Sequence, residues 1–381
     1  MKIQNSSVNS REIVLTMLME IYAQKEFSHI LLRQVLDKYD YLPVQEKAFI
    51  KRLTEGTLER TLQLDYLINQ FSKVEVKKMK PLIRALLRMS VYQILYMDSV
   101  PDSAACNEAV KLAGNHRFVS LKGFVNGVLR SIARQKDRLP WPEEEKDPLG
   151  WLSVLYSMPV WLVEFFRNQY GPERTRGILA ALMEERPVTV RIREDLSIEE
   201  KQSLLKQWEE AGIQTQIHPL LNYAFVVKEL DGVNNLPGFT EGKVAVQDVS
   251  SMLVAEAAGI KDEMHILDVC AAPGGKAVHA AQKLRGTGKV LARDLIEYKV
   301  DFIRENASRQ QVENLTAQVW DALCKDEEHE SWADLIFCDL PCSGLGIMGR
   351  KRDIKSRINM EEIEAVTELQ RGILETIWGC L

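Results

Sequence analysis

Apolar residues recur at helical spacing through the first third of the chain, as at Val14, Leu18 and Ile21. Ser10 precedes this first helix and can cap it. The same period predicts further helices over residues 43–69, from Pro81 onwards, near 103–114 and over 118–134. No strand-like alternation interrupts the region. The pattern therefore predicts an all-helical domain over residues 1–138.

The pattern changes twice after this domain. A polar, proline-bearing segment at 139–148 indicates a linker. A small α+β module over 149–239 is predicted next, with helices at 149–183 and 197–211 and strands at 187–192 and near 213–228. From about residue 240 strands and helices alternate, over 243–247, 249–258, 265–269, 275–284, 288–293, 297–309, 314–319, 333–338 and 361–379. This alternation predicts a Rossmann-like, doubly wound parallel sheet over 240–381, and hence a multidomain α and α/β protein.

Composition narrows the class of protein. The 381 residues suffice for two or three domains with a sizeable core. A net charge of −5 excludes a globally basic nucleic-acid binder, so any contact with a polyanion must use local patches. No apolar run approaches membrane-spanning length, and the six cysteines show neither a CxxC pair nor a disulfide-framework spacing. We therefore expect a cytoplasmic protein with no membrane partner and no bound metal.

A glycine-containing motif lies between a predicted strand and a predicted helix. The strand at 265–269 leads into the segment Asp268-Val269-Cys270-Ala271-Ala272-Pro273-Gly274-Gly275-Lys276. Glycines at such a turn let the backbone approach a ligand, and the helix N-terminus adds free N–H groups and partial positive charge. The segment is not GxGxxG, so a compact nucleoside cofactor is favoured over a dinucleotide. The plainer alternative is a tight strand–helix connection.

Acidic residues follow three further strands. Asp294 follows the strand at 288–293, Asp321 the strand at 314–319, and Asp339 the strand at 333–338. Open α/β sheets bind their ligands at the carboxyl ends of strands. Asp294 is placed to accept hydrogen bonds from ribose hydroxyls, and Asp321 from an adenine amino group. The alternative for each is an exposed acid in a turn.

The most specific motif is the segment Asp339-Leu340-Pro341-Cys342-Ser343-Gly344. Free cysteines are often small buried hydrophobes, which suits Cys106, Cys324 and Cys338. It does not suit Cys342, because a Pro-Cys-Ser-Gly turn leaving a strand is not core. A thiol and a carboxyl group at this edge fit methyl transfer to C5 of a pyrimidine, since both groups must meet the base.

These motifs resemble those of a known family. Residues 268–276 and 339–344 are similar to the motifs of the Sun/Fmu-type RNA (cytosine-C5)-methyltransferases. Residues 1–135 resemble the NusB-like domain of one branch, ribosomal RNA small subunit methyltransferase B, and residues 149–239 resemble the family's small RNA-binding domain. The resemblance covers nearly the whole chain. It implies S-adenosyl-L-methionine as cofactor, held by Cys270, Ala271, Ala272, Pro273, Gly274, Gly275, Lys276, Asp294, Asp321 and Asp339.

The resemblance also implies a reaction and a partner. The family transfers a methyl group from S-adenosyl-L-methionine to C5 of a cytosine, here in the 16S ribosomal RNA of an unassembled or partly assembled small subunit. A thiolate adds to C6 while an acid engages N3, which makes C5 nucleophilic. By the family's pattern, Asp339 is that acid and Cys342 assists product release. The attacking cysteine belongs to a Thr-Cys motif on the following strand.

The sequence departs from the family's pattern at one important point. The 381 residues contain no Thr-Cys motif, and the chain ends at Leu381, within the helix after the Asp-x-Pro-Cys motif. Cys380 is the nearest substitute, but it would lie at a helix end. We therefore expect a C-terminally truncated chain that lacks the last strands of its sheet. The alternative function is a catalytically inactive RNA-binding remnant, and a third interpretation is a nicotinamide-dependent oxidoreductase.

A basic run after the Cys342 loop is the expected RNA contact, because Lys and Arg neutralise phosphates and position the strand. The predicted RNA-binding residues are Arg350, Lys351, Arg352 and Lys355. Arg352 stands where the family usually has a proline. Arg191 and Arg193 on the middle strand are candidates for extending that surface, and a lysine cluster at 73–80 forms a second patch. The alternative for each basic run is a solvated face.

Overall fold

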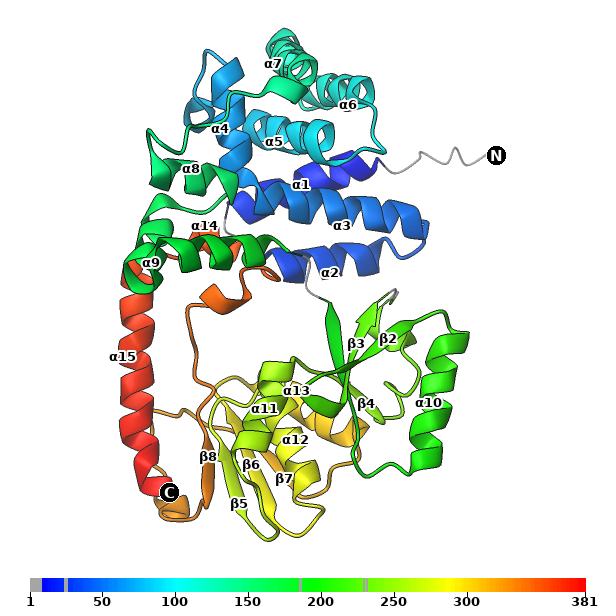
Figure 1. Cartoon of the computed structure of the whole chain (residues 1–381), viewed down its shortest axis with the longest axis vertical. Coiled ribbons are helices and arrows are strands. Elements are labelled where there is room, and N and C mark those ends of the chain that lie inside the picture. Colours follow the sequence, from blue (N-terminus) through cyan, green and yellow to red (C-terminus); the bar gives the residue numbers. More distant parts are fainter. Residues whose placement is uncertain (1–8, 24–26, 185–186, 229, 231) are drawn as a thin grey trace. The chain divides into compact units, whose positions relative to one another are not determined.

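The computed structural model describes residues 9–23, 27–184, 187–228, 230 and 232–381, which fold into two compact units (Figure 1). One unit holds the residues up to 185 together with 344–358, and the other holds 186–343 together with 359–381. The chain therefore passes between the units three times. The second passage comes directly after the Asp-x-Pro-Cys motif.

The first unit begins with a bundle of helices. Their bounds are α1 (Ser10–Tyr22), α2 (Ser28–Lys38), α3 (Val44–Glu59), α4 (Thr61–Phe71), α5 (Pro81–Tyr96), α6 (Asp102–Asn115) and α7 (Lys122–Arg134), with short 3₁₀ helices at Val76–Lys78, Val119–Leu121 and Lys136–Arg138. The apolar faces of these helices share one core, in which Leu18, Leu53, Leu86 and Leu129 are buried. The predicted helical character of this region is confirmed.

The cap of α1 differs from the predicted one. Asn9 Oδ1 accepts hydrogen bonds from the N–H groups of Arg11 and Glu12 at 3.0 and 3.3 Å. Ser10 is buried instead, and its hydroxyl donates to the Glu46 carboxylate. The prediction of a Ser10 cap was wrong because Asn and Ser cap helices about equally well, so the sequence does not choose between adjacent candidates.

Two further helices and a returning segment complete the first unit. They are α8 (Pro148–Leu155), α9 (Val160–Met183) and residues 344–358, which hold a 3₁₀ helix at Leu345–Ile347 and α14 (Ile354–Arg357). α9 is broken at Gly171, whose φ is 76°. Leu162 of α9 and Met348 of the returning segment share a second core. No single described helix has the length and hydropathy to cross a membrane. The pair α8 and α9 meets these two criteria only when the helices are taken together, and they are bent by 112° relative to each other.

The second unit contains an antiparallel sheet with the strand order β2-β3-β1-β4. The bounds are β1 (Val188–Ile192), β2 (Gln214–His218), β3 (Leu221–Lys228) and β4 (Val244–Val246), with α10 (Ile198–Glu210) and a 3₁₀ helix at Val233–Asn235. Ser197 and Glu200 form a capping box at the start of α10. The buried Trp208 packs this helix against the sheet, so the small α+β module has its own core.

β4 corrects the predicted topology. The sequence pattern placed residues 243–247 at the start of the parallel series, but β4 pairs antiparallel with β1, with Val246 opposite Val190 and Val244 opposite Ile192. Hydrophobic alternation identifies a strand without identifying its partner. The strand therefore belongs to the antiparallel sheet, and the parallel series begins after it.

A parallel sheet with the order β7-β6-β5-β8 forms the rest of the second unit (Figure 1). The bounds are β5 (His265–Asp268), β6 (Lys289–Asp294), β7 (Leu315–Val319), β8 (Leu335–Phe337), α11 (Val249–Ala257), α12 (Gly275–Lys283), α13 (Glu297–Arg309) and α15 (Met360–Ile377), with 3₁₀ helices at Glu327–His329 and Trp378–Cys380. Successive strand residues face opposite sides. Ile266 shares a core with residues of α12 and α13, and Leu267 shares one with residues of α15. The predicted doubly wound parallel sheet is confirmed.

Candidate active site

The parallel strands place the two strongest sequence motifs at one point of the sheet. β6 and β7 extend on one side of β5, and β8 lies on the other, so the strand order reverses between β5 and β8. Open α/β sheets bind ligands at such a switch point, outside the carboxyl ends of the strands. The segment after β5 carries the 268–276 motif, and the segment after β8 carries Asp339 and Cys342.

Glycine shapes the loop between β5 and α12. Gly274 has a φ of +99°, and a Cβ there would lie 3.3 Å from Ile303 Cα and Cγ2. The Gly274 N–H donates to the Ala271 carbonyl at 2.7 Å, which closes the loop just before α12 begins at Gly275. A Cβ at Gly275 would meet no atom within 4 Å. The first turn of α12, with its free N–H groups and positive dipole end, thus borders open space.

Asp268, the last residue of β5, is a buried acid without an ordinary partner. It is 1% exposed, and neither carboxylate oxygen completes a hydrogen bond of normal geometry among the described residues, although the Cys270 backbone N–H makes a weaker contact that acts to lower the pKa. Burial raises the pKa of this carboxyl group to about 7, while Lys276 opposes the shift and Asp339 adds to it. Because buried polar groups are normally paired, a carboxylate with so few donors at this edge, called the orphaned carboxylate below, has acceptor capacity for a ligand.

Asp294 and Asp321 occupy different environments. Asp294 is 7% exposed, accepts a hydrogen bond from the Ala272 N–H at 3.3 Å and lies 3.4 Å from Lys299 Nζ. It is therefore in contact with the glycine loop. Asp321 is exposed and accepts from the Leu323 N–H at 2.9 Å, within its own turn. The structure brings Asp294 to the predicted cofactor loop and gives no such contact for Asp321.

The thiols near the sheet differ in their readiness to react. Burial, followed by the charge of Asp294, raises the pKa of Cys270 to about 11, so this thiol stays protonated at neutral pH. Cys342 is exposed on its loop. Cys380 is 5% exposed and burial raises its pKa, which makes it a poor nucleophile. Of the three cysteines expected to be buried hydrophobes, Cys106 is buried, whereas Cys324 and Cys338 are exposed.

Asp339 is joined to the first turn of α12. Lys276 Nζ donates to Asp339 Oδ2 at 2.5 Å, while the Asp339 side chain remains 60% exposed. Farther along the loop, the Pro341 carbonyl accepts from Gln370 Nε2 of α15 at 2.7 Å. The Asp339 carboxylate is thus held in place and still open to a ligand.

The basic run after the Cys342 loop is not one open surface. Arg350 is exposed and Lys351 is half-buried. Arg352 instead pairs with the Glu59 carboxylate, and Lys355, only 7% exposed, donates to the Glu59 carbonyl. Burial lowers the pKa of the Lys355 ammonium to about 7. The expected RNA-facing surface is therefore corrected: Arg352 and Lys355 contact α3 inside the first unit.

The two arginines of the middle strand also turn inward. Arg191 is 1% exposed, and Arg193 pairs with Asp195 at 2.5 Å. Neither residue extends an open basic surface. Burial of Arg191, and a hydrogen bond from Arg193 to the distant Gln310 carbonyl at 3.1 Å, explain the difference, because a linear charge pattern shows neither.

Two features of the site escaped sequence reasoning. Asp268 was seen only as part of a longer motif, and its burial without a partner was not foreseen. The contact between Lys276 and Asp339 was not foreseen either. The sequence did contain one signal for this contact: both motifs follow predicted parallel strands, and the carboxyl ends of parallel strands meet at one edge of the sheet.

Three family models match successive parts of the chain. The NusB family model matches residues 8–134, and the RsmF/B-like methyltransferase ferredoxin-like domain matches residues 158–233. The 16S rRNA methyltransferase RsmB/F model matches residues 256–381. The first match covers the helical bundle, the second runs from α9 of the first unit into the antiparallel sheet, and the third covers the parallel sheet.

Relatives cover nearly the whole chain. The probable ribosomal RNA small subunit methyltransferase B of Bacillus subtilis (strain 168) is 35% identical over 369 residues, which is 96% of this chain and 81% of the relative. The Synechocystis protein of the same name is 30% identical over 378 residues, 97% of this chain and 82% of the relative. The crystal structure of PH0851 has the same fold, with a TM-score of 0.78 at 21% identity over 98% of this chain and 84% of that chain. The resemblance inferred from the motifs is confirmed: the chain belongs to the ribosomal RNA small subunit methyltransferase B family.

Proposed function

We propose that the chain binds S-adenosyl-L-methionine at the switch point between β5 and β8 and serves methyl transfer to C5 of a cytosine in 16S ribosomal RNA. The observation that carries the proposal is the orphaned Asp268 carboxylate beside the glycine loop. S-adenosyl-L-methionine carries an ammonium group and a sulfonium centre, both of which suit an anionic site. When bound, it supplies an electrophilic methyl group. Membership of a methyltransferase family supports the same assignment.

The chain offers complementary groups for such a ligand along one edge of the sheet. Asp268 is the proposed acceptor for the ammonium group, and the first-turn N–H groups of α12 suit its carboxylate. Asp294 is proposed for the ribose hydroxyls and Asp321 for the adenine amino group. The backbone between Cys270 and Lys276 would line the ligand. A dinucleotide is a poorer fit because the loop lacks the GxGxxG pattern.

Asp339 is the proposed acid for the base. C5 of cytosine is a poor nucleophile until a thiolate adds to C6 and an acid engages N3. The Asp339 side chain is 60% exposed, so a base can reach it, and its Oδ2 pairs with Lys276 Nζ at 2.5 Å. The target base must be unpaired or flipped out to enter this edge.

Cys342 is the proposed release residue. After methyl transfer, the C5 proton and the bond between C6 and sulfur must both be lost to restore the ring. The exposed Cys342 thiol lies on the same loop as Asp339 and is available for that step. The nucleophile itself is a cysteine of a Thr-Cys pair in the resembled family, and no such pair occurs in the 381 residues. A second candidate function is RNA binding without turnover.

The proposed RNA contacts are limited to basic side chains that remain accessible. Arg350 is exposed and Lys351 half-buried on the segment that follows the Cys342 loop. Their proposed partner is 16S ribosomal RNA in an unassembled or partly assembled small subunit, in the cytoplasm. Electrostatic contacts of this kind position RNA without reading its sequence.

Methyl transfer to protein-free 16S ribosomal RNA tests the proposal. The chain is incubated with S-adenosyl-L-methionine labelled in its methyl group, and the RNA is then digested to nucleosides. Because the family's attacking cysteine does not occur in the 381 residues, a version that also carries the family's Thr-Cys strand is assayed beside the chain. The expected product of that version is labelled 5-methylcytidine, absent when it also carries Asp339→Asn. Label on another atom of cytosine or on ribose would overturn the C5 assignment. Binding of both ligands without label would favour the second function.

A further inference from the structure

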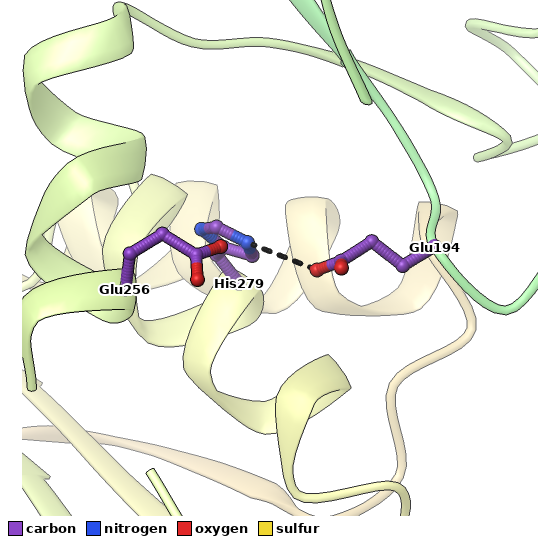
Figure 2. Close-up of side chains that lie close together, drawn as sticks. All are labelled: Glu194, Glu256 and His279. Carbon is purple, nitrogen blue, oxygen red and sulfur yellow. Dashed lines mark ion pairs between the residues drawn. The ribbon is translucent and has the colours of Figure 1, made fainter. Parts of the chain in front are cut away.

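Three side chains from separate segments of the second unit converge beside α12 (Figure 2). Glu194 follows β1, Glu256 belongs to α11, and His279 belongs to α12. Their composition would suit a metal ion, but Lys283 Nζ already lies 2.9 Å from Glu194 Oε1 and 2.7 Å from Glu256 Oε1. The lysine ammonium therefore takes the place of a cation between the two carboxylates. The cluster is better understood as a junction between the antiparallel sheet and α12.

His279 contributes to this junction as an uncharged ring. It is fully buried, its Nε2 lies 3.8 Å from Glu194 Oε1 (Figure 2), and its ring meets the edge of the Tyr223 ring at 5.7 Å. Burial lowers the pKa of His279 to about 4, although Glu194 opposes the shift. Tyr223 of β3 also donates a hydrogen bond to Glu256 at 2.5 Å. Ion pairing and aromatic packing thus act on the same face of α12.

Arg191 of β1 makes a second connection to α12. Its guanidinium donates to Gln247 Oε1 at 2.9 Å, to Gln282 Oε1, and to Gln310 Oε1 at 3.3 Å. Arg191 is 1% exposed, and burial lowers its pKa to about 10. Gln282 lies in the last turn of α12, so one buried side chain of the antiparallel sheet holds the end of this helix. The planar guanidinium fork suits three acceptors at once.

The other end of α12 carries the proposed cofactor loop. α12 runs from Gly275 to Lys283, nine residues or about 12 Å of rise, and it is a single rigid element. Its first turn holds Gly275 and Lys276, and its last turn holds the partners of Arg191 and Glu194. A change of tilt at the last turn therefore displaces the glycine loop relative to Asp268 and Asp339.

We propose that Arg191 and Glu194 are positioning residues for cofactor binding. By fixing the last turn of α12, they hold the glycine loop and Lys276 in the arrangement that receives S-adenosyl-L-methionine. Neither residue belongs to the parallel sheet, and neither is among the residues proposed to contact the cofactor. The inference rests on the S-adenosyl-L-methionine site proposed above.

Calorimetric titration of S-adenosyl-L-methionine into the full chain tests the inference. Glu194→Gln keeps the size of the side chain but removes its charge, and the Glu194 side chain is 45% exposed, so this variant is expected to fold. The dissociation constant should rise roughly three- to thirtyfold, as for other residues that act through a packed network. The thermal unfolding midpoint should change little. Glu200→Gln is the matched control, since it breaks an exposed ion pair with Lys243 (3.2 Å) in the same module away from α12.

Two further variants separate positioning from general stability. Glu194→Asp, which keeps the charge, should recover part of the affinity. Lys283→Met combined with Glu194→Gln should weaken binding by less than the sum of the two single changes, because both remove the contact between Glu194 and Lys283, while Lys283→Met also removes the pair with Glu256. Unchanged affinity in Glu194→Gln, or equal weakening in Glu200→Gln, would overturn the inference while leaving the cofactor site intact. Absence of binding by the unsubstituted chain would overturn both proposals.

Discussion

Lys276 Nζ and Asp339 Oδ2 lie 2.5 Å apart, and this contact joins the first turn of α12 to the segment that leaves β8. The two residues are 63 positions apart in the sequence, and the parallel sheet brings them together at its switch point. One side chain belongs to the proposed cofactor loop and the other to the motif proposed to meet the base. The contact thus links the proposed cofactor site to the proposed site of the cytosine base.

Asp339→Asn should affect methyl transfer and cofactor binding differently. The variant keeps the shape of the side chain but cannot act as an acid. In a version that also carries the family's Thr-Cys strand, the rate of methyl transfer should therefore fall by roughly a hundredfold or more. Affinity for S-adenosyl-L-methionine should change by less than about threefold, because the Asp339 side chain is 60% exposed and Asp268 is the buried acceptor. Rates from labelled methyl transfer and affinities from calorimetry check this pair of results. Unchanged turnover would remove Asp339 as the acid.

Asp268 should make the stability of the ligand-free protein depend on pH. Its folded pKa of about 7 lies above the ordinary value of 3.8, so the folded chain holds this proton more tightly than the unfolded chain. Stability should therefore fall as pH rises from about 4 to 7, by up to roughly 4 kcal/mol, and stay level above that. Asp268→Asn should flatten this slope, whereas Asp262→Asn, at an exposed position, should not. Thermal unfolding at pH 5 and pH 7.5 compares the three proteins, and equal slopes would rule out a buried, orphaned acid.

The helical unit should depend on a buried ion pair. Arg88 donates two hydrogen bonds to the Asp65 carboxylate, each at 2.6 Å, and the Arg88 side chain is only 9% exposed. Asp65→Asn leaves that guanidinium without its counter-charge, so the free energy of unfolding should drop by roughly 3 kcal/mol. Asp37→Asn is the control, since Asp37 and Arg33 form an exposed pair at 3.9 Å. Denaturant unfolding measures this free energy. A decrease for Asp65→Asn no larger than that for Asp37→Asn would contradict the buried ion pair.

RNA binding should distinguish the accessible from the buried part of the basic run. Arg350→Ala should weaken binding and lower the salt dependence by about one phosphate contact, because Arg350 is exposed. Lys355→Met should leave that dependence unchanged, since Lys355 is 7% exposed and binds the Glu59 carbonyl. Filter binding at several salt concentrations measures both. A larger change in salt dependence for Lys355→Met than for Arg350→Ala would contradict this assignment and show that Lys355 is exposed when RNA binds.

Local patterns were sufficient for most of the fold. The apolar period predicted the helical region, and alternation predicted the strands of both sheets, because each side chain's face follows from its place in the repeat. Which strands pair with each other was harder to predict. β4 has only three residues, and its pairing with β1 depends on contacts between segments more than 50 positions apart, such as Val190 with Val246.

The chemistry of individual charges was less predictable than the motifs that contain them. Asp268, Lys276 and Asp339 lie in motifs visible in the sequence, yet burial and proximity depend on the folded sheet. Lys355 appeared as part of a surface run because its partner, Glu59, is 296 positions away. Tertiary partners decide whether a charge faces solvent, and a linear pattern does not carry that information.

The affinity of the 381-residue chain for S-adenosyl-L-methionine, measured by calorimetry at pH 7.5, is the decisive quantity. We expect one site with a dissociation constant of about 1 µM to 1 mM and no comparable binding of NAD. Asp268→Asn should bind at least about tenfold more weakly while remaining folded, because the ammonium loses a buried charged acceptor. No binding by the unsubstituted chain, tighter binding of NAD, or equal affinity in Asp268→Asn would contradict a cofactor site between β5 and β8.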